Sequence, residues 1–131
     1  MRREITNRAD IILLVDTFYN KVEQDKNIGP IFTDIAKIDW SLHLPKMYDF
    51  WESVLFGQAI YKGNPMLTHF KLREKAPLKA KEFNAWKEIF FNTVDELFLG
   101  TNAAQIKQKA ASIADLMHFK LNSTETKINI I

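Results

Sequence analysis

The stretch YKGNPMLTHFKL, residues 61–72, places one of the three histidines of the chain shortly after a turn-forming Gly-Asn-Pro sequence. Neutral imidazole is a common metal ligand, so His69 is a candidate functional residue. His43 lies where a helix is expected to begin. His118 lies near the end of another helix, where a polar or cationic side chain interacts well with the helix dipole. Taken one by one, each histidine could equally be structural.

Composition narrows the possible chemistry. The chain has 131 residues, of which 47% are hydrophobic and 26% are charged, as is typical of one folded domain. It contains no cysteine, so any metal must be bound through nitrogen or oxygen. The 18 basic and 16 acidic residues are balanced and scattered, which argues against a nucleic-acid or membrane partner. The N-terminal apolar run at 11–15 is too short for a signal peptide, so we expect a cytoplasmic protein.

Apolar spacing predicts an almost wholly helical chain. Asn7 is a good N-cap for a first helix of about 18 residues, with Tyr19 at the edge of its apolar stripe. A second helix should end at Gly57. Because proline has no N–H, this helix either begins near Leu44 or begins earlier, from Asp39, with a kink at Pro45.

Two further helices are predicted after an irregular segment at 58–79, in which residues 66–72 could form one or two turns. The third helix carries an aromatic face over 83–98 and ends at Gly100. Thr101 is expected to cap the fourth, whose inward residues should be Ala104, Ala110, Ile113, Leu116 and Met117. We expect one domain over 1–121 and a flexible C-terminal tail over 122–131. The predicted fold class is all-α, which by itself says nothing of function.

Five phrases, in order along the chain, carry a resemblance to a known family. They are FYNKV at 18–22, IGPIF at 28–32, HLPKMYDFWESVLFG at 43–57, YKGNPMLTHFKL at 61–72 and FNAWKEIF at 83–90. The chain resembles the truncated haemoglobins, specifically those of group III, over about residues 11–121. As in that group, no Gly-Gly pair occurs. The resemblance implies an abbreviated globin, a two-over-two helical sandwich enclosing a haem.

The resemblance also implies roles for individual residues. His69 corresponds to the proximal histidine that binds the iron of haem b, which leaves the opposite face open for a diatomic gas. Tyr19 and Trp86 correspond to distal hydrogen-bond donors, and His43 to a distal gating residue. Pro45 departs from the pattern expected for that helix, so the orientation of His43 stays open. Haem contacts are expected from Phe32, Met47, Phe50, Trp51, Met66 and Tyr61, with Tyr61, Lys62, Lys71 and Arg73 as alternatives for holding the propionates.

A protein of this kind is expected to bind oxygen reversibly at ferrous haem, together with nitric oxide or carbon monoxide. Redox chemistry on the bound gas, either nitric oxide detoxification or a peroxidase-like reaction, would need a separate reductase because the chain has no flavin or nicotinamide motif. The alternatives are an oxygen or redox sensor or scavenger without turnover, and a helical interaction module that binds no haem. We expect a monomer, because no long exposed apolar stripe is evident.

Overall fold

The computed structural model describes residues 2–31, 39–57 and 80–126. These residues form four α-helices, α1 (Arg8–Gln24), α2 (Trp40–Phe56), α4 (Ala80–Leu97) and α5 (Thr101–Thr126). The described residues contain no strand, and their one isolated bridge joins Arg3 to Phe98. The predicted all-α fold is therefore confirmed. No helix in the described part of the chain is long and apolar enough to span a membrane.

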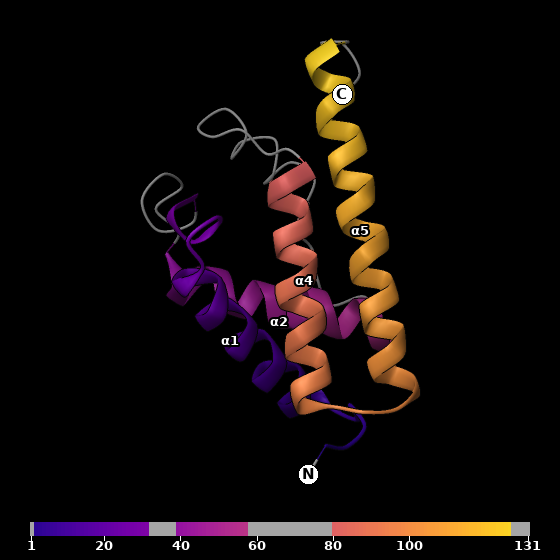
Figure 1. The fold of residues 1–131 in the computed structure, drawn as a ribbon. Helices are drawn as coiled ribbons and strands as arrows, with labels where there is room; N and C mark the ends of the chain where they lie inside the picture. The colour runs from indigo at the N-terminus through magenta and orange to yellow at the C-terminus, as the bar shows by residue number, and fades with distance from the viewer. Residues whose placement is uncertain (1, 32–38, 58–79, 127–131) are drawn as a thin grey trace.

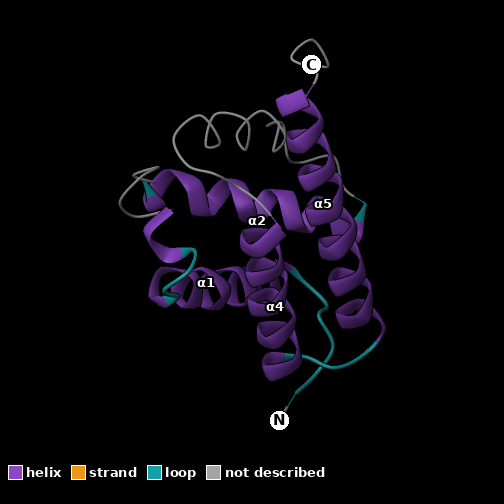
Figure 2. Ribbon diagram, turned by 45° about the horizontal axis from the view of Figure 1, so that its top comes forward, coloured by secondary structure: helices purple, strands orange, loops and turns teal. Residues whose placement is uncertain are grey.

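The helices pack as two pairs. In Figures 1 and 2, α4 and α5 lie side by side, and α1 and α2 cross them. Contacts join α4 to α5, α1 to α2, α1 to α4 and α2 to α5. Each helix thus packs mainly against two others, as the predicted two-over-two sandwich requires. The core lies where the pairs cross.

Helix α1 begins as the sequence predicts. The side chain of Asn7 accepts a hydrogen bond from the N–H of Asp10, which satisfies one of the free donors of the first turn. The helix is 17 residues long, and its buried side includes Ile11, Val15, Phe18, Tyr19 and Val22. It ends before Gly29 and Pro30, with Asp25 as its C-cap. The Asp25 carboxylate accepts hydrogen bonds from the N–H groups of Asn27 and Ile28.

Helix α2 takes the longer of the two predicted forms. It starts at Trp40, the Asp39 side chain caps it by accepting from Ser41 N–H, and Pro45 lies inside it. The Ser41 hydroxyl also donates to Asp39 and, together with the N–H bonds, lowers the pKa of that carboxyl. At the other end Gly57 adopts φ +73°, the left-handed conformation that favours glycine, so the predicted C-cap is confirmed.

Helix α5 differs from its prediction in which face it buries. Ala104 and Leu116, predicted to pack inward, are exposed, and that prediction was wrong. The alanines of this helix leave more than one weakly apolar face, so apolar spacing alone does not fix its orientation. The helix continues to Thr126, into the segment for which we expect a tail, and the domain boundary at 121 stays a prediction. Its buried residues are Ala103, Ile106, Ala110 and Ala114.

The N-terminal segment fixes the start of α5. Glu4, rather than Thr101, supplies its cap, because the Glu4 carboxylate accepts from the N–H of Ala103 at 3.0 Å. Hydrogen bonds from backbone N–H groups of this turn lower the pKa of Glu4 despite partial burial. Gly100 has φ +135°, a backbone conformation that favours glycine, and a Cβ there would press on the Glu4 carboxylate.

The same segment ties three helices together. The Arg3 carbonyl accepts from Leu99 N–H at 2.9 Å, next to the end of α4, and the Ile5 carbonyl accepts from the Asn102 side chain at 2.8 Å. The Ile5 side chain is fully buried in the core. Arg3 also pairs with Asp10 in the first turn of α1. Residues 2–6 therefore join the beginning of α1 to the α4–α5 connection.

Buried Asp10 gives the fold a predictable response to acid. The Arg3 guanidinium, with help from the Thr6 N–H and hydroxyl, lowers the pKa of Asp10 from 3.8 to about 2. Because the folded-state pKa lies below the unfolded one, the stabilisation is present above about pH 4 and is lost as the pH falls through about 2. Its size is on the order of 1–2 kcal/mol, reduced by the exposure of Arg3 to solvent.

We therefore expect Asp10→Asn to lower the free energy of unfolding at pH 7 and to flatten its decline between about pH 5 and pH 2. Urea titrations at a series of pH values measure both effects. The matched control is Asp115→Asn, which removes an exposed carboxylate paired with Lys87 at 2.8 Å and should change little. Equal acid sensitivity of the wild type and Asp10→Asn would contradict the role of Asp10.

Candidate functional site

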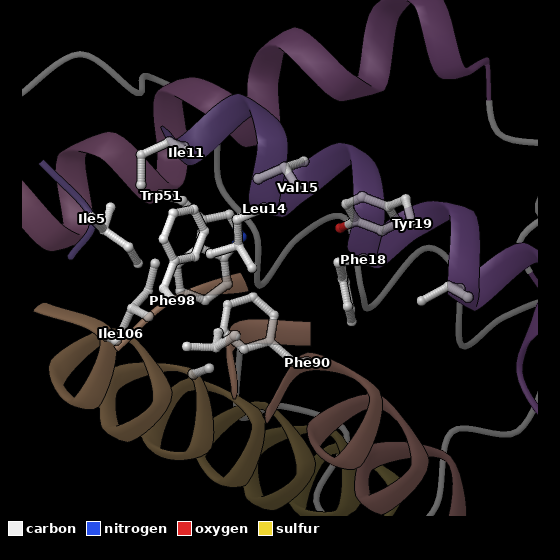
Figure 3. Packing of buried hydrophobic residues seen from close by; sticks show 14 of the residues in the cluster. Ile5, Ile11, Leu14, Val15, Phe18, Tyr19, Trp51, Phe90, Phe98 and Ile106 are labelled. Atoms are coloured by element: carbon white, nitrogen blue, oxygen red, sulfur yellow. The ribbon is translucent and has the colours of Figure 1, made fainter. Parts of the chain in front are cut away.

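Tyr19 is buried on α1 and contacts rings from two helices. Its ring centroid lies 4.8 Å from Phe18, 5.3 Å from Trp40 and 5.2 Å from His43. Only 6% of the residue is exposed. Figure 3 shows Tyr19 beside Phe18 at one end of the labelled core. A phenol in this position keeps its ring among apolar neighbours while its O–H remains able to donate a hydrogen bond.

Trp86 is half-buried on α4 and lies in a stack of aromatic rings. It is nearly parallel to Phe90, at 5.5 Å and 13°, and to Trp51 of α2, at 6.4 Å and 24°. It also meets Phe18 edge to face at 5.5 Å. The indole is therefore fixed by contacts with α1, α2 and its own helix.

Phe18 connects these two predicted donors. Its fully buried ring contacts Tyr19 on one side and Trp86 on another, both edge to face. Tyr19 and Trp86 are far apart in sequence, and the packing of α1 on α4 brings both into contact with one ring. The structure thus places both in one region of the molecule.

His43 belongs to the same region despite Pro45 two residues later. It lies in the first turn of α2, half-buried, with its Nε2 atom shielded from solvent. Its ring meets Tyr19 edge to face at 5.2 Å. Proline removes one intrahelical hydrogen bond and crowds the carbonyl four residues earlier, yet α2 continues through residue 45, and His43 meets Tyr19 of α1. The orientation that the sequence left open is therefore toward Tyr19.

Trp40 completes the ring cluster and was missed by sequence reasoning. Its ring lies 5.3 Å from Tyr19 and 5.7 Å from His43. A signal was present, since residues three apart on a helix lie on the same side and Trp40 precedes His43 by three. With the start of α2 undecided between residues 39 and 44, this spacing could not be applied.

The predicted haem contacts on α2 lie along the same helix. Trp51 is buried and packs on Phe90 at 4.8 Å, while Met47 and Phe50 are half-buried and pack against the core. Their side chains offer an apolar wall. The other predicted site residues lie outside the described residues, namely Phe32, Tyr61, Lys62, Met66, His69, Lys71 and Arg73.

Polar contacts hold α1 against α2 beyond the ring cluster. The Tyr48 hydroxyl of α2 donates to the Asp16 carboxylate of α1. Arg8 lies 2.9 Å from Asp49 and 2.5 Å from Glu52. Partial burial, together with the Asp16 carboxylate, raises the pKa of Tyr48 to about 12, so this phenol stays protonated in ordinary buffers. These contacts help fix the spacing between the two helices that carry Tyr19 and His43.

The cluster formed by Tyr19, His43, Trp40, Phe18 and Trp86 combines apolar ring faces with a few polar atoms. Such a setting suits a small ligand that carries partial negative charge, because O–H and N–H donors are strengthened where water is excluded. Three helices each supply at least one of these side chains. The cluster therefore places the O–H of Tyr19 and the N–H of Trp86 among aromatic rings.

Comparison with known proteins identifies the class. The family model described as bacterial-like globin matches residues 4–122. A group 3 truncated hemoglobin of Campylobacter jejuni is 31% identical over 123 residues, which cover 92% of this chain and 93% of that protein. The crystal structure of a group III truncated hemoglobin from the same organism matches with a TM-score of 0.79, at 31% identity, over 92% of this chain and 95% of that one.

The chain belongs to the bacterial-like globin family. Its sequence and its fold both match a truncated haemoglobin of group III, which confirms the resemblance seen in the sequence. Globins bind small ligands at haem, so membership of the family implies a haem-based small-ligand site. The described residues are chemically compatible with haem, because Met47 and Phe50 are half-buried apolar side chains and Tyr19 and Trp86 carry O–H and N–H donors.

Proposed function

We propose that this protein binds haem b and reversibly binds oxygen, and also nitric oxide or carbon monoxide, at ferrous iron. The observation that carries the proposal is the ring cluster, in which Tyr19 contacts His43 and is linked through Phe18 to Trp86. Family membership supports it, as does the similarity to a protein named a truncated hemoglobin.

In this proposal His69 is the iron ligand, through one nitrogen of its neutral imidazole. The apolar side chains on α2 would hold one side of the macrocycle, and the remaining contacts would come from residues before and after that helix. The residues proposed to contact haem are Phe32, Met47, Phe50, Trp51, Tyr61 and Met66. When bound, haem supplies a ferrous iron that takes a diatomic ligand.

Tyr19 and Trp86 would donate hydrogen bonds to that ligand, which becomes partly negative when it is oxygen. A hydrogen bond to a charged acceptor contributes about 1.5–3 kcal/mol, and each 1.4 kcal/mol corresponds to about tenfold in an equilibrium constant. Two such donors would slow the release of oxygen strongly. The protein would then retain oxygen rather than deliver it.

His43 would shield the ligand from water on the side of α2. Its position against the edge of the Tyr19 ring and the burial of its Nε2 atom support this role. Excluding water strengthens the hydrogen bonds made by the two donors, because the local dielectric constant falls. A cytoplasmic location and a monomeric state remain predictions.

Haem binding through His69 is tested by reconstitution. We expect the purified chain to take up haemin with an intense Soret band, and His69→Ala to shift or weaken that band because the axial imidazole is lost. The control is His118→Ala, since His118 stacks on Phe83 at 5.1 Å and belongs to no part of the ring cluster. A Soret band that His69→Ala leaves unchanged would reject His69 as the ligand.

The distal donors are tested by the rate of oxygen dissociation. Tyr19→Phe and Trp86→Phe keep an aromatic body but remove the donor, so each should raise that rate severalfold or more. Tyr48→Phe is the comparison variant, because it deletes a phenol that donates to Asp16 outside the cluster. It loosens one contact between α1 and α2 but removes no distal donor, so its effect should be smaller than that of either donor variant. Flash photolysis and ligand-replacement kinetics measure the rates. If both donor variants release oxygen like the wild type, the proposed pocket is wrong.

Redox turnover is separated from simple binding by mixing the oxygenated protein with nitric oxide. Dioxygenation would convert one nitric oxide and one oxygen to nitrate and leave ferric haem, which a separate reductase must reduce before the next cycle. We expect rapid formation of the ferric spectrum in a stopped-flow spectrometer, with nitrate in equal amount. Slow conversion, with oxygen binding intact, would leave a sensor or scavenger as the function.

A further inference from the structure

We infer that Trp40 is a positioning residue that holds His43 and Tyr19 in register across the α1–α2 contact. The inference rests on the proposed function, because it concerns the residues placed there beside the ligand. Neither the sequence pattern nor the family resemblance assigned a role to Trp40. It touches no reacting atom in this proposal and acts through its two neighbours.

The first observation is a closed triangle of rings. The three centroid distances are 5.3 Å for Tyr19 and Trp40, 5.7 Å for Trp40 and His43, and 5.2 Å for Tyr19 and His43. The planes are steeply inclined in all three pairs, at 53°, 73° and 79°. Each ring therefore limits the rotation of the other two, and inclined aromatic pairs contribute about 0.5–1.5 kcal/mol beyond simple burial.

The second observation is where Trp40 and His43 lie on α2. Both precede Pro45, which has no N–H to donate to the carbonyl of Ser41, four residues earlier. The first turn, residues 40–44, is thus joined to the rest of α2 by a weakened hydrogen-bond ladder. Its backbone is held at the beginning by Asp39, whose carbonyl accepts from the N–H groups of Leu42 and His43 at 3.1 and 2.9 Å.

The third observation is that the rest of α2 has its own anchors on α1. After Pro45, Tyr48 donates to Asp16, and Arg8 pairs with Asp49 and Glu52. Trp51 is buried in the core. The body of the helix therefore has anchors of its own, whereas the first turn is held by the ring triangle together with Leu44, which packs against the core. Trp40 contributes two of the three sides of that triangle.

Removing the indole should therefore loosen residues 40–44 and leave the body of α2 in place. His43 and Tyr19 would lose a common neighbour and would sample more rotamers. In the haem-loaded protein, the Tyr19 donor would be less well aimed and His43 would shield less well. Both the association and the dissociation rates of oxygen should rise, with Trp40→Phe intermediate because phenylalanine keeps part of the contact.

The experiment compares Trp40→Ala and Trp40→Phe with Leu42→Ala, a control in the same turn whose side chain is 63% exposed. Backbone hydrogen exchange of the purified chain, followed by mass spectrometry, is the readout that does not depend on haem. We expect exchange at residues 42–44 to accelerate about tenfold or more in Trp40→Ala and less in Trp40→Phe. Residues 48–56 should exchange as in the wild type, and Leu42→Ala should match the wild type throughout.

A further variant tests whether the hydrogen bond missing at Pro45 makes the first turn depend on Trp40. Pro45→Ala restores an N–H at residue 45, so it should slow exchange in the first turn and reduce the effect of Trp40→Ala when the two are combined. Unchanged exchange in Trp40→Ala would overturn the inference whether or not haem binds. Equal acceleration along the whole of α2 would also overturn it, because Trp40 would then serve general stability.

Oxygen kinetics distinguish failure of the inference from failure of the proposed function. Severalfold changes in both rates for Trp40→Ala, with Trp40→Phe in between, are expected. If Tyr19→Phe changes the dissociation rate and Trp40→Ala does not, Trp40 has no positioning role. If Tyr19→Phe also has no effect, the proposed distal pocket fails, and with it the link from Trp40 to the ligand.

Discussion

Phe18 and Tyr19 are consecutive on α1, and both are buried. Successive helical residues point about 100° apart, so the broad buried face of α1 allows Phe18 and Tyr19 to meet different helices. Here α4 covers one side and α2 the other. Phe18 packs on Trp86 and Phe90 of α4, and Tyr19 packs on rings of α2. The candidate site follows from this double coverage, because it brings residues of three helices around one dipeptide.

Contacts outside the ring cluster also help to place these helices. At the N-terminal end, residues 2–6 link the first turn of α1 to the α4–α5 connection through Asp10, Leu99 and Ala103. Along α2, the polar contacts of Arg8 and of Asp16 hold α1 in place. Each exposed pair contributes little alone, whereas the buried carboxylate of Asp10 contributes more. Within the ring cluster, the positions of the aromatic side chains therefore depend on their shapes and on the angles between their rings.

Sequence reasoning recovered what local patterns determine. The N-cap at Asn7, the apolar stripe of α1 and the left-handed Gly57 each depend on residues within one helix, and the structure confirms them. It failed where the answer depended on another part of the chain. The orientation of α5 was wrong at Ala104 and Leu116, because docking of Glu4 and Ile5 helps select its buried face. Residues 2–6 show no periodic pattern from which their docking against α5 could be predicted.

In the candidate site, too, the features that depend on several helices could not be predicted from spacing. Spacing alone gives no reason to associate Tyr19 with His43 or Trp86, and the family resemblance made that association. Trp40 escaped both approaches, although helical geometry links it to His43 once the start of α2 is known. A proline within a helical pattern can mark either a helix boundary or a position inside a continuing helix, and packing decides between the two. At Pro45 the rings of Trp40, His43 and Tyr19 are part of that packing. Trp40 and His43 form the turn of α2 that precedes the proline, and the same two residues belong to the candidate site.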